Sequence, residues 1–196
     1  MCFMLMEASL RRFDPPLKMV VMGVSGCGKT TVGMALASQL GAAFFDGDDL
    51  HPAANIAKMS RGEPLTDDDR WPWLTQVAEV LQGDGPRIVG CSALKRVYRD
   101  HIRQVAAVPV VFVHLAGARA VIEARMRART GHFMPPALLD SQFATLESPG
   151  VDEAAVTVDI DQPVEAVIDA IRRLDAQQVK GLGPKGQKES RPDGSR

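Results

Sequence analysis

The feature that most constrains this chain is an octapeptide placed between a predicted strand and a predicted helix. Residues 23–30 read Gly-Val-Ser-Gly-Cys-Gly-Lys-Thr and satisfy the pattern G-x-x-x-x-G-K-[ST]. The apolar run at residues 18–24 leads into the octapeptide through Gly23, as expected of a buried parallel strand. After it, apolar residues recur at helical spacing until Gly41 ends the helix. In this context the pattern predicts a phosphate-binding loop, or P-loop.

Each part of the loop has a physical reason. Glycines let the backbone curl so that successive N–H groups point at phosphate oxygens, and the following helix directs its positive end at the same anion. Lys29 is expected to reach the β and γ phosphates of ATP, and the Thr30 hydroxyl to enter the shell of a Mg²⁺ ion. Cys27 is expected to be simply a small residue that fits inside the loop, and the alternative is that the inward N–H groups lower the pKa of its thiol. The predicted nucleotide ligands in this segment are Gly23, Val24, Ser25, Gly26, Cys27, Gly28, Lys29, Thr30 and Thr31.

Strands and helices alternate along the rest of the chain. This predicts an α/β fold, a three-layer P-loop NTPase domain with a five-stranded parallel sheet and ligands beyond the carboxyl ends of the strands. We expect the domain to cover residues 18–175, with a flexible extension at 1–17 and a disordered polar tail at 176–196. The predicted strands cover residues 18–24, 42–45, 87–91, 110–115 and 156–160. Residues 50–59 are expected to be helical, and residues 73–81 carry a further apolar stripe.

Composition excludes several classes of function. The net charge of -1 does not favour a nucleic-acid partner. The three cysteines form no CxxC pair, which argues against a disulfide framework or a structural zinc site and predicts a cytoplasmic location. No apolar stretch approaches the roughly 20 residues that span a bilayer, so we expect no membrane association.

A pair of carboxylates follows the second predicted strand. Asp46, Gly47 and Asp48 form a D-G-D triplet whose two carboxylates project to the same side of an extended backbone. We expect Asp46 to order a metal-bound water and Asp48 to accept a proton from an attacking hydroxyl, the alternative being an ordinary turn. A guanine-specific switch would need an N-K-x-D element after a late strand, but residues 156–163 read VTVDIDQP. The sequence therefore favours an enzyme.

Longer segments resemble one family. DGDDLHPAANIAKMSRGEPLTDDDRWPWL (46–74), CSALKRVYRD (91–100), RTGHFM (129–134), QFATLESPG (142–150) and VDIDQP (158–163) resemble successive motifs of the gluconokinases, relatives of the shikimate kinases. The Gly-Gly-Gly of the shikimate kinases is replaced by CSALK. The resemblance implies the sheet order 2-3-1-4-5, a small helical lid at about 125–147, ATP with Mg²⁺, D-gluconate as acceptor, 6-phospho-D-gluconate as product, and a homodimer.

Gluconate is a linear polyol with a carboxylate, so its pocket needs cations and polar groups. Asp48 is the candidate base, and His51 and Asn55, spaced i and i+4, should face the same cleft. The alternative is that His51 merely begins a helix. Positive charge for the acceptor is expected from three further residues, Arg70, Lys95 and Arg99. Their alternatives are pairing of Arg70 with the aspartates at 67–69 and simple solvation of the cations in the 95–107 helix.

The lid should contribute further residues. Arg129 is the candidate for stabilising the transferring phosphoryl group, Arg125 for contacting the nucleotide, and His132 for contacting the substrate. A solvated basic helix face is the alternative. Gln162, after the last strand, is a candidate for the edge of the adenine pocket.

Three functions compete at this point. The leading one is phosphorylation of gluconate, the second is phosphorylation of another small acceptor (a shikimate-like polyol or a nucleoside monophosphate), and the third is a non-catalytic module gated by nucleotide. Trp71 and Trp73 are expected to serve packing or dimer contacts.

Overall fold

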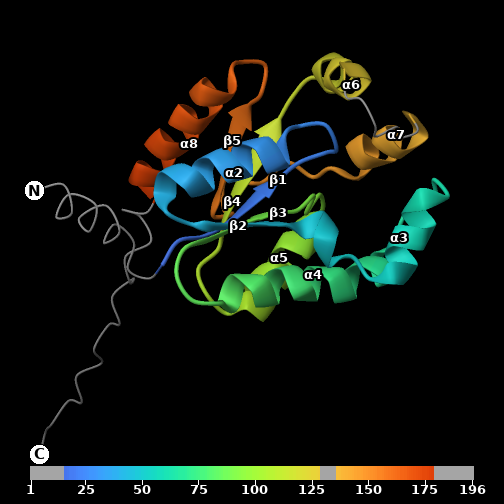
Figure 1. Cartoon of the computed structure of the whole chain (residues 1–196), viewed down its shortest axis with the longest axis horizontal. Coiled ribbons are helices and arrows are strands. Elements are labelled where there is room, and N and C mark those ends of the chain that lie inside the picture. The colour runs from blue at the N-terminus through green and yellow to red at the C-terminus, as the bar shows by residue number, and fades with distance from the viewer. Residues whose placement is uncertain (1–15, 129–135, 179–196) are drawn as a thin grey trace, which may run out of the picture.

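A five-stranded parallel sheet forms the centre of the computed structural model, which describes residues 16–128 and 136–178 (Figure 1). Its strands run in the order β2-β3-β1-β4-β5. All four neighbouring pairs are parallel. Both the predicted fold class and the sheet order are therefore confirmed. The strands are β1 (Lys18–Met22), β2 (Ala43–Asp46), β3 (Arg87–Gly90), β4 (Val111–Ala116) and β5 (Ala155–Asp159).

Helices cover both faces of the sheet. Figure 1 shows α2 and α8 on one face and α4 and α5 on the other, so the domain has three layers. The remaining helices, α3, α6 and α7, gather beyond the end at which the strands finish. The helices are α2 (Lys29–Leu40), α3 (Ala53–Ser60), α4 (Asp67–Gln82), α5 (Arg96–Ala106), α6 (Arg119–Ala128), α7 (Pro136–Thr145) and α8 (Val164–Gln178), with a 3₁₀ turn, η1, at Gly47–Leu50.

The central strand shows why the sheet is buried on both sides. Successive side chains of a strand point to opposite faces, and in β1 Met19 and Val21 belong to the core beneath α2 and α8. Val20 and Met22 belong to the second core, beneath α4 and α5. Every residue of β1 is buried, which explains why the strand reads as one continuous apolar run.

Several predicted boundaries differ from the structure. Helix α4 begins at Asp67, ahead of the apolar stripe from Trp73, because Thr66 and Asp69 form a capping box. Helix α3 begins only at Ala53, because η1 intervenes after β2. Helix α8 continues to Gln178, past the predicted end of the domain at 175. The extension up to residue 15 and the tail from 179 lie outside the described residues, so their predicted disorder stays a prediction.

No helix in the described part of the chain combines the length and apolar character that crossing a membrane requires.

Candidate active site

The loop between β1 and α2 has the curvature that its sequence predicts. Gly23, Gly26 and Gly28 have φ angles of 139°, 82° and 101°, a region that side chains disfavour. A Cβ atom on Gly23 would also lie 2.9 Å from the backbone oxygen of Leu115. The Gly23 N–H donates to the Ser92 carbonyl at 3.3 Å, which ties the loop to the turn after β3. Glycine is thus required both for conformation and for space.

Two side chains at the start of α2 make contacts around the loop. The Lys29 Nζ donates to the carbonyls of Gly23 and Val24, at 3.2 and 3.3 Å, across the loop. The Thr30 hydroxyl donates to Asp46 Oδ2 at 2.8 Å. The two predicted metal ligands, far apart in sequence, are therefore neighbours in space.

The thiol of Cys27 lies inside the loop. It is fully buried, and burial raises its pKa above the usual value for a thiol. The alternative of a lowered pKa is therefore wrong, because loss of hydration outweighs the favourable charge of Lys29 and the local backbone N–H bonds. Cys27 therefore fills space inside the loop.

Two cavities meet at the phosphate loop, and Gly26 lines both of them. The smaller, about 210 Å³, lies on the side of α8 and brings together several predicted nucleotide residues. Arg125 reaches into this region, where it donates to the Ile160 carbonyl at 2.6 Å and to the Cys27 carbonyl at 3.4 Å. Its lining residues are Gly26, Cys27, Gly28, Thr31, Val32, Arg125, Ile160, Gln162, Val164 and Val167.

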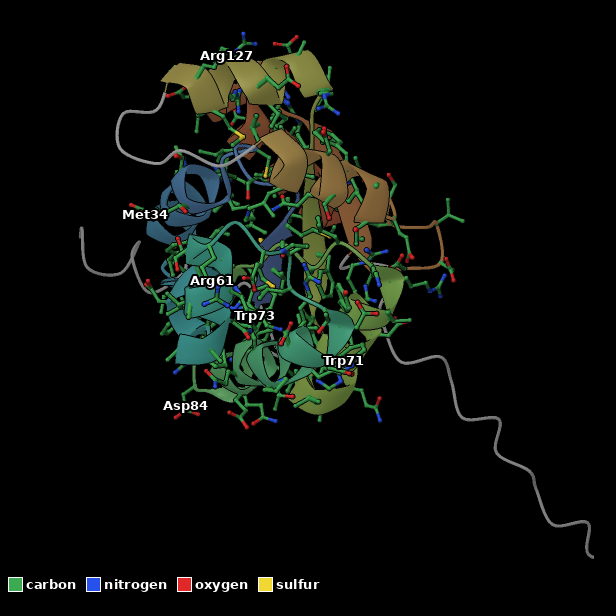
Figure 2. All side chains as sticks on the ribbon, turned by 90° about the vertical axis from the view of Figure 1, so that its right-hand side faces the viewer. Met34, Arg61, Trp71, Trp73, Asp84 and Arg127 are labelled. Atoms are coloured by element: carbon green, nitrogen blue, oxygen red, sulfur yellow. The ribbon has the colours of Figure 1, made fainter. Side chains whose placement is uncertain are left out.

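The larger cavity, about 370 Å³, opens on the other side of the loop. It brings together three residues of the predicted acceptor site, Asp48, His51 and Arg70. Figure 2 looks onto the end of the molecule where the strands finish, and Trp73, another lining residue, lies near the middle of this view. The remaining lining residues are Ser25, Gly26, Lys29, Met59, Glu63, Pro64, Leu65, Ser92, Met126, Leu138, Ser141 and Gln142.

The D-G-D triplet forms the turn that the sequence offered as the alternative, and its chemical role stays a prediction. Asp46 Oδ1 accepts from the Asp48 N–H at 3.1 Å, so this carboxylate caps η1 and forms a turn. A Cβ atom on Gly47 would lie 2.3 Å from the Gly90 carbonyl, so the triplet packs directly on the end of β3. The turn fixes the backbone, and the exposed Asp48 side chain lines the larger cavity.

His51 is held neutral at the edge of this cavity. Its ring stacks on Trp73 with centroids 4.1 Å apart and planes 16° from parallel. Burial, with the nearby charge of Arg70, lowers the pKa of His51 to about 4. The Asn55 amide donates from Nδ2 to the Asp69 carbonyl at 2.8 Å and lies 3.4 Å from His51 Nδ1. Because that amide nitrogen can only donate, the ring proton belongs on Nε2.

Asn55 therefore supports His51 and does not itself line the cavity. Trp73 is held in turn by a hydrogen bond from its Nε1 to the Gly47 carbonyl at 2.7 Å. Arg70, from the first turns of α4, donates from Nη1 to the Leu65 carbonyl while its side chain lines the cavity.

Two predicted acceptor ligands lie elsewhere. Lys95 pairs with Asp67 at 2.8 Å and is absent from the lining of the cavity. Arg99 is completely buried, and its Nε and Nη2 donate to the two carboxylate oxygens of Glu153 at 2.6 and 2.7 Å. The expectation that Arg99 faces the acceptor is corrected by this geometry, because a carboxylate distant in sequence already occupies its guanidinium.

Arg99 instead holds the turn beside the site. Its Nη1 lies 3.3, 3.2 and 3.0 Å from the carbonyls of Ala93, Leu94 and Glu147. Ala93 has a positive φ of 42°, an unfavourable conformation for alanine. The neighbouring Ser92 lines the larger cavity, so Arg99 contributes by fixing this turn.

Sequence reasoning missed several residues that line the larger cavity, and three of them show why. Trp73 is buried packing, as expected, yet it also forms the cavity wall. Ser92 follows β3, and the rule that ligands sit beyond strand ends could have found it. Gln142 of α7 contacts the phosphate loop across 117 residues of sequence, a separation that no local pattern reveals. The predicted lid residues Arg129 and His132 lie outside the described residues.

Comparison with known proteins agrees with this geometry. A family model described as an AAA domain matches residues 19–149. The thermoresistant gluconokinase of Escherichia coli is 49% identical over 154 residues, 76% of this chain and 87% of that protein. The gluconokinase of Gluconobacter oxydans is 46% identical, covering 81% of this chain and 90% of that one. A crystal structure of a gluconokinase from Sinorhizobium meliloti superposes with a TM-score of 0.78 at 47% identity, covering 85% of this chain and 98% of its own. The chain therefore belongs to the gluconokinase family of P-loop kinases.

Proposed function

We propose that this protein transfers the γ-phosphate of ATP to the 6-hydroxyl of D-gluconate, giving 6-phospho-D-gluconate and ADP. The observation that carries the proposal is the meeting of two cavities at one phosphate loop, with Gly26 common to both. One cavity suits a nucleoside, and the other presents a carboxylate, a cation and a neutral imidazole to a polar acceptor. Membership of the gluconokinase family supports this choice of substrate.

The nucleotide is bound by the loop and the smaller cavity. The N–H groups of residues 23–30 and the N-terminus of α2 offer positive potential to the phosphates. The Lys29 ammonium leaves the Gly23 and Val24 carbonyls and pairs with the terminal phosphates. The base and ribose occupy the cavity edged by Arg125 and Gln162.

The residues at the foot of the loop fit a Mg²⁺ ion. Thr30 Oγ1 and Asp46 Oδ2 are hard oxygen donors 2.8 Å apart beside the phosphate loop. Among the described residues no group of three or more His, Cys, Asp or Glu side chains could hold a metal. Mg²⁺ commonly binds through one or two protein oxygens together with substrate phosphates, which matches this donor set. When bound, the ion offsets the negative charge that the phosphoryl group carries during transfer.

The acceptor is held by three side chains of the larger cavity. Arg70 pairs with the carboxylate of gluconate, since it is the cation among the predicted acceptor ligands that lines this cavity. His51, neutral with its proton on Nε2, donates to a hydroxyl and keeps no competing charge in the pocket. The stack on Trp73 fixes the plane of that donor.

Transfer requires one proton to move. The 6-hydroxyl oxygen attacks the γ-phosphorus, the bond from that phosphorus to the β–γ bridging oxygen breaks, and the hydroxyl proton passes to Asp48. Asp48 is suited to this role because η1 places it on the wall of the cavity that Lys29 and His51 also line. Arg129, predicted to stabilise the transferring group, and His132, predicted to contact the acceptor, remain part of the proposal on the family resemblance alone.

The acceptor is tested by measuring ADP release over a panel of sugar acids, sugars, shikimate and nucleoside monophosphates. Gluconate should raise ADP release far above every other compound. A stronger response to shikimate or a nucleotide would replace the substrate, and ADP release that no acceptor stimulates would favour the nucleotide-gated module.

A homodimer and a cytoplasmic location belong to the same proposal and rest on the family resemblance and the cysteine content. Light scattering on the purified protein, with a mass near twice the 21.2 kDa of one chain, would support the dimer. A mass of one chain at micromolar concentration would exclude it.

A further inference from the structure

One side chain of α7 covers the phosphate loop. The Ser25 N–H donates to Gln142 Oε1 at 2.7 Å, and Gln142 Nε2 donates to Ser25 Oγ at 3.1 Å. Both ends of one carboxamide thus engage a single residue of the loop. The oxygen that Ser25 binds here has the same hydrogen-bonding role that a phosphate oxygen has in a P-loop.

The lining of the two cavities indicates which phosphate group of a bound nucleotide would reach Ser25. Cys27 and Gly28 line the smaller cavity, which we assign to the nucleoside and call the nucleoside cavity. Ser25 and Lys29 line the larger one, which we assign to the acceptor and call the acceptor cavity, and Gly26 lines both. A triphosphate that leaves the nucleoside cavity along the loop therefore reaches Ser25 with its terminal group. A diphosphate, one group shorter, ends before it.

We propose that Gln142 Oε1 is a stand-in for a γ-phosphate oxygen, which ATP must displace and ADP need not. The inference rests on the proposed binding of nucleotide phosphates by this loop. A backbone N–H inside a protein has to be satisfied, and the carboxamide satisfies it when no nucleotide is bound. A phosphate oxygen is the stronger acceptor because it is charged, so the exchange is favourable. Gln142 is in this view a positioning residue.

The exchange reaches the acceptor cavity as well. Helix α7 contributes Leu138 and Ser141 to the wall of that cavity, next to Gln142. Release of the carboxamide by a triphosphate therefore frees the helix that borders the acceptor. Binding of a triphosphate, the nucleotide that can donate a phosphoryl group, therefore changes the wall of the acceptor cavity, whereas binding of a diphosphate does not.

The test compares affinities for the ATP analogue AMP-PNP and for ADP by calorimetry at fixed Mg²⁺ concentration. Gln142→Leu keeps the size of the side chain and removes the stand-in oxygen. This variant should bind AMP-PNP about 3- to 10-fold more tightly than wild type, because the net contribution of one neutral hydrogen bond no longer has to be displaced. Its affinity for ADP should stay within about 2-fold of wild type. Gln142→Glu keeps an acceptor but adds charge, so it should weaken AMP-PNP more than ADP. Gln76→Leu, an exposed glutamine of α4, is the matched control and should leave both affinities unchanged.

The ratio of the two affinities decides the matter, since a loss of fold stability would change both together. Three results for Gln142→Leu would each contradict the role of Gln142 Oε1. They are equal changes in affinity for AMP-PNP and ADP, no change in either affinity, and weaker binding of AMP-PNP. Wild-type protein that binds neither nucleotide would overturn the nucleotide assignment itself. Thermal melting of each variant confirms that the compared proteins are folded.

Discussion

Replacing Glu153 by glutamine tests whether Arg99 serves stability or substrate. The carboxylate of Glu153 receives two hydrogen bonds from Arg99 and one from the Gly150 N–H at 3.0 Å. Arg103 adds a longer ion pair at 3.4 Å. The Arg99 and Glu153 side chains are 0% and 3% exposed, so solvent does little to screen the pair. Glu153→Gln keeps the shape of the side chain but leaves the buried Arg99 charge uncompensated.

The size of the effect follows from the pKa of Glu153. Mainly its hydrogen bonds with Arg99 lower this pKa from 4.5 to about 2. At about 1.4 kcal/mol for each pH unit, this corresponds to about 3 kcal/mol of stabilisation at neutral pH. Removal of one partner from a buried ion pair costs a similar amount, about 3–5 kcal/mol. For a domain of this size we expect the melting temperature to fall by about 6–12 °C.

The pH dependence has a fixed sign. Because the folded-state pKa of Glu153 is depressed, its stabilisation is complete above about pH 4.5 and is lost as the pH falls toward 2. Glu153→Gln should therefore lose stability at pH 7 and approach wild type at the acid end of this range.

The assay is urea denaturation and thermal melting, together with the KM for gluconate at 25 °C. Asp152→Asn is the control, since Asp152 pairs with Arg96 at 2.7 Å but both side chains are about half exposed, 59% and 49%. This exposed pair should contribute less than about 1 kcal/mol. Glu153→Gln should keep a KM within about 2-fold of wild type. Unchanged stability combined with a strongly raised KM would refute the structural role of Arg99 and restore it as an acceptor ligand.

Three further predictions address the site itself. Lys29→Ala should lower kcat by at least about 100-fold with an unchanged melting temperature, because a cation at the terminal phosphates is lost; near-normal turnover would exclude the nucleotide assignment. Asp48→Asn should lower kcat by about 100-fold or more with little change in KM, and a normal rate would assign the base elsewhere. His51 has a pKa lowered from 6.5 to about 4, so the unfolded chain binds its proton first and this residue alone costs about 2 kcal/mol of stability between pH 7 and 5. Urea denaturation of His51→Gln should show a flatter pH profile over that range, whereas a profile equal to wild type would contradict a neutral, buried His51; the buried His114, whose pKa is also lowered, remains in both proteins.

The sheet could be predicted because its strands are buried on both faces. Residues such as Val20 and Val21 face opposite cores, so periodicity gives way to an unbroken apolar run that is easily recognised. The phosphate loop could be predicted because its glycines serve local needs of conformation and space. Both features are encoded in consecutive residues.

The errors arose where distant residues decide the outcome. Lys95 and Arg99 lie one helical turn apart, which suggested a shared cleft, yet Arg99 pairs with Glu153 54 residues later in the chain. The start of α4 at Asp67 was missed because three aspartates follow one another there, and the sequence pattern did not single out Asp69 as the partner of Thr66 in the capping box. The Gln142 contact with the phosphate loop likewise depends on how α7 packs, which local sequence does not reveal.

The central claim is that an alcohol in the larger cavity faces the terminal phosphate held by residues 23–30. A crystal structure with AMP-PNP, Mg²⁺ and gluconate measures this directly. The account predicts the 6-hydroxyl oxygen about 3–3.5 Å from the γ-phosphorus and within hydrogen-bonding distance of Asp48, with the carboxylate at Arg70. Gluconate bound outside this cavity, or with its carboxylate toward the phosphate, would contradict it.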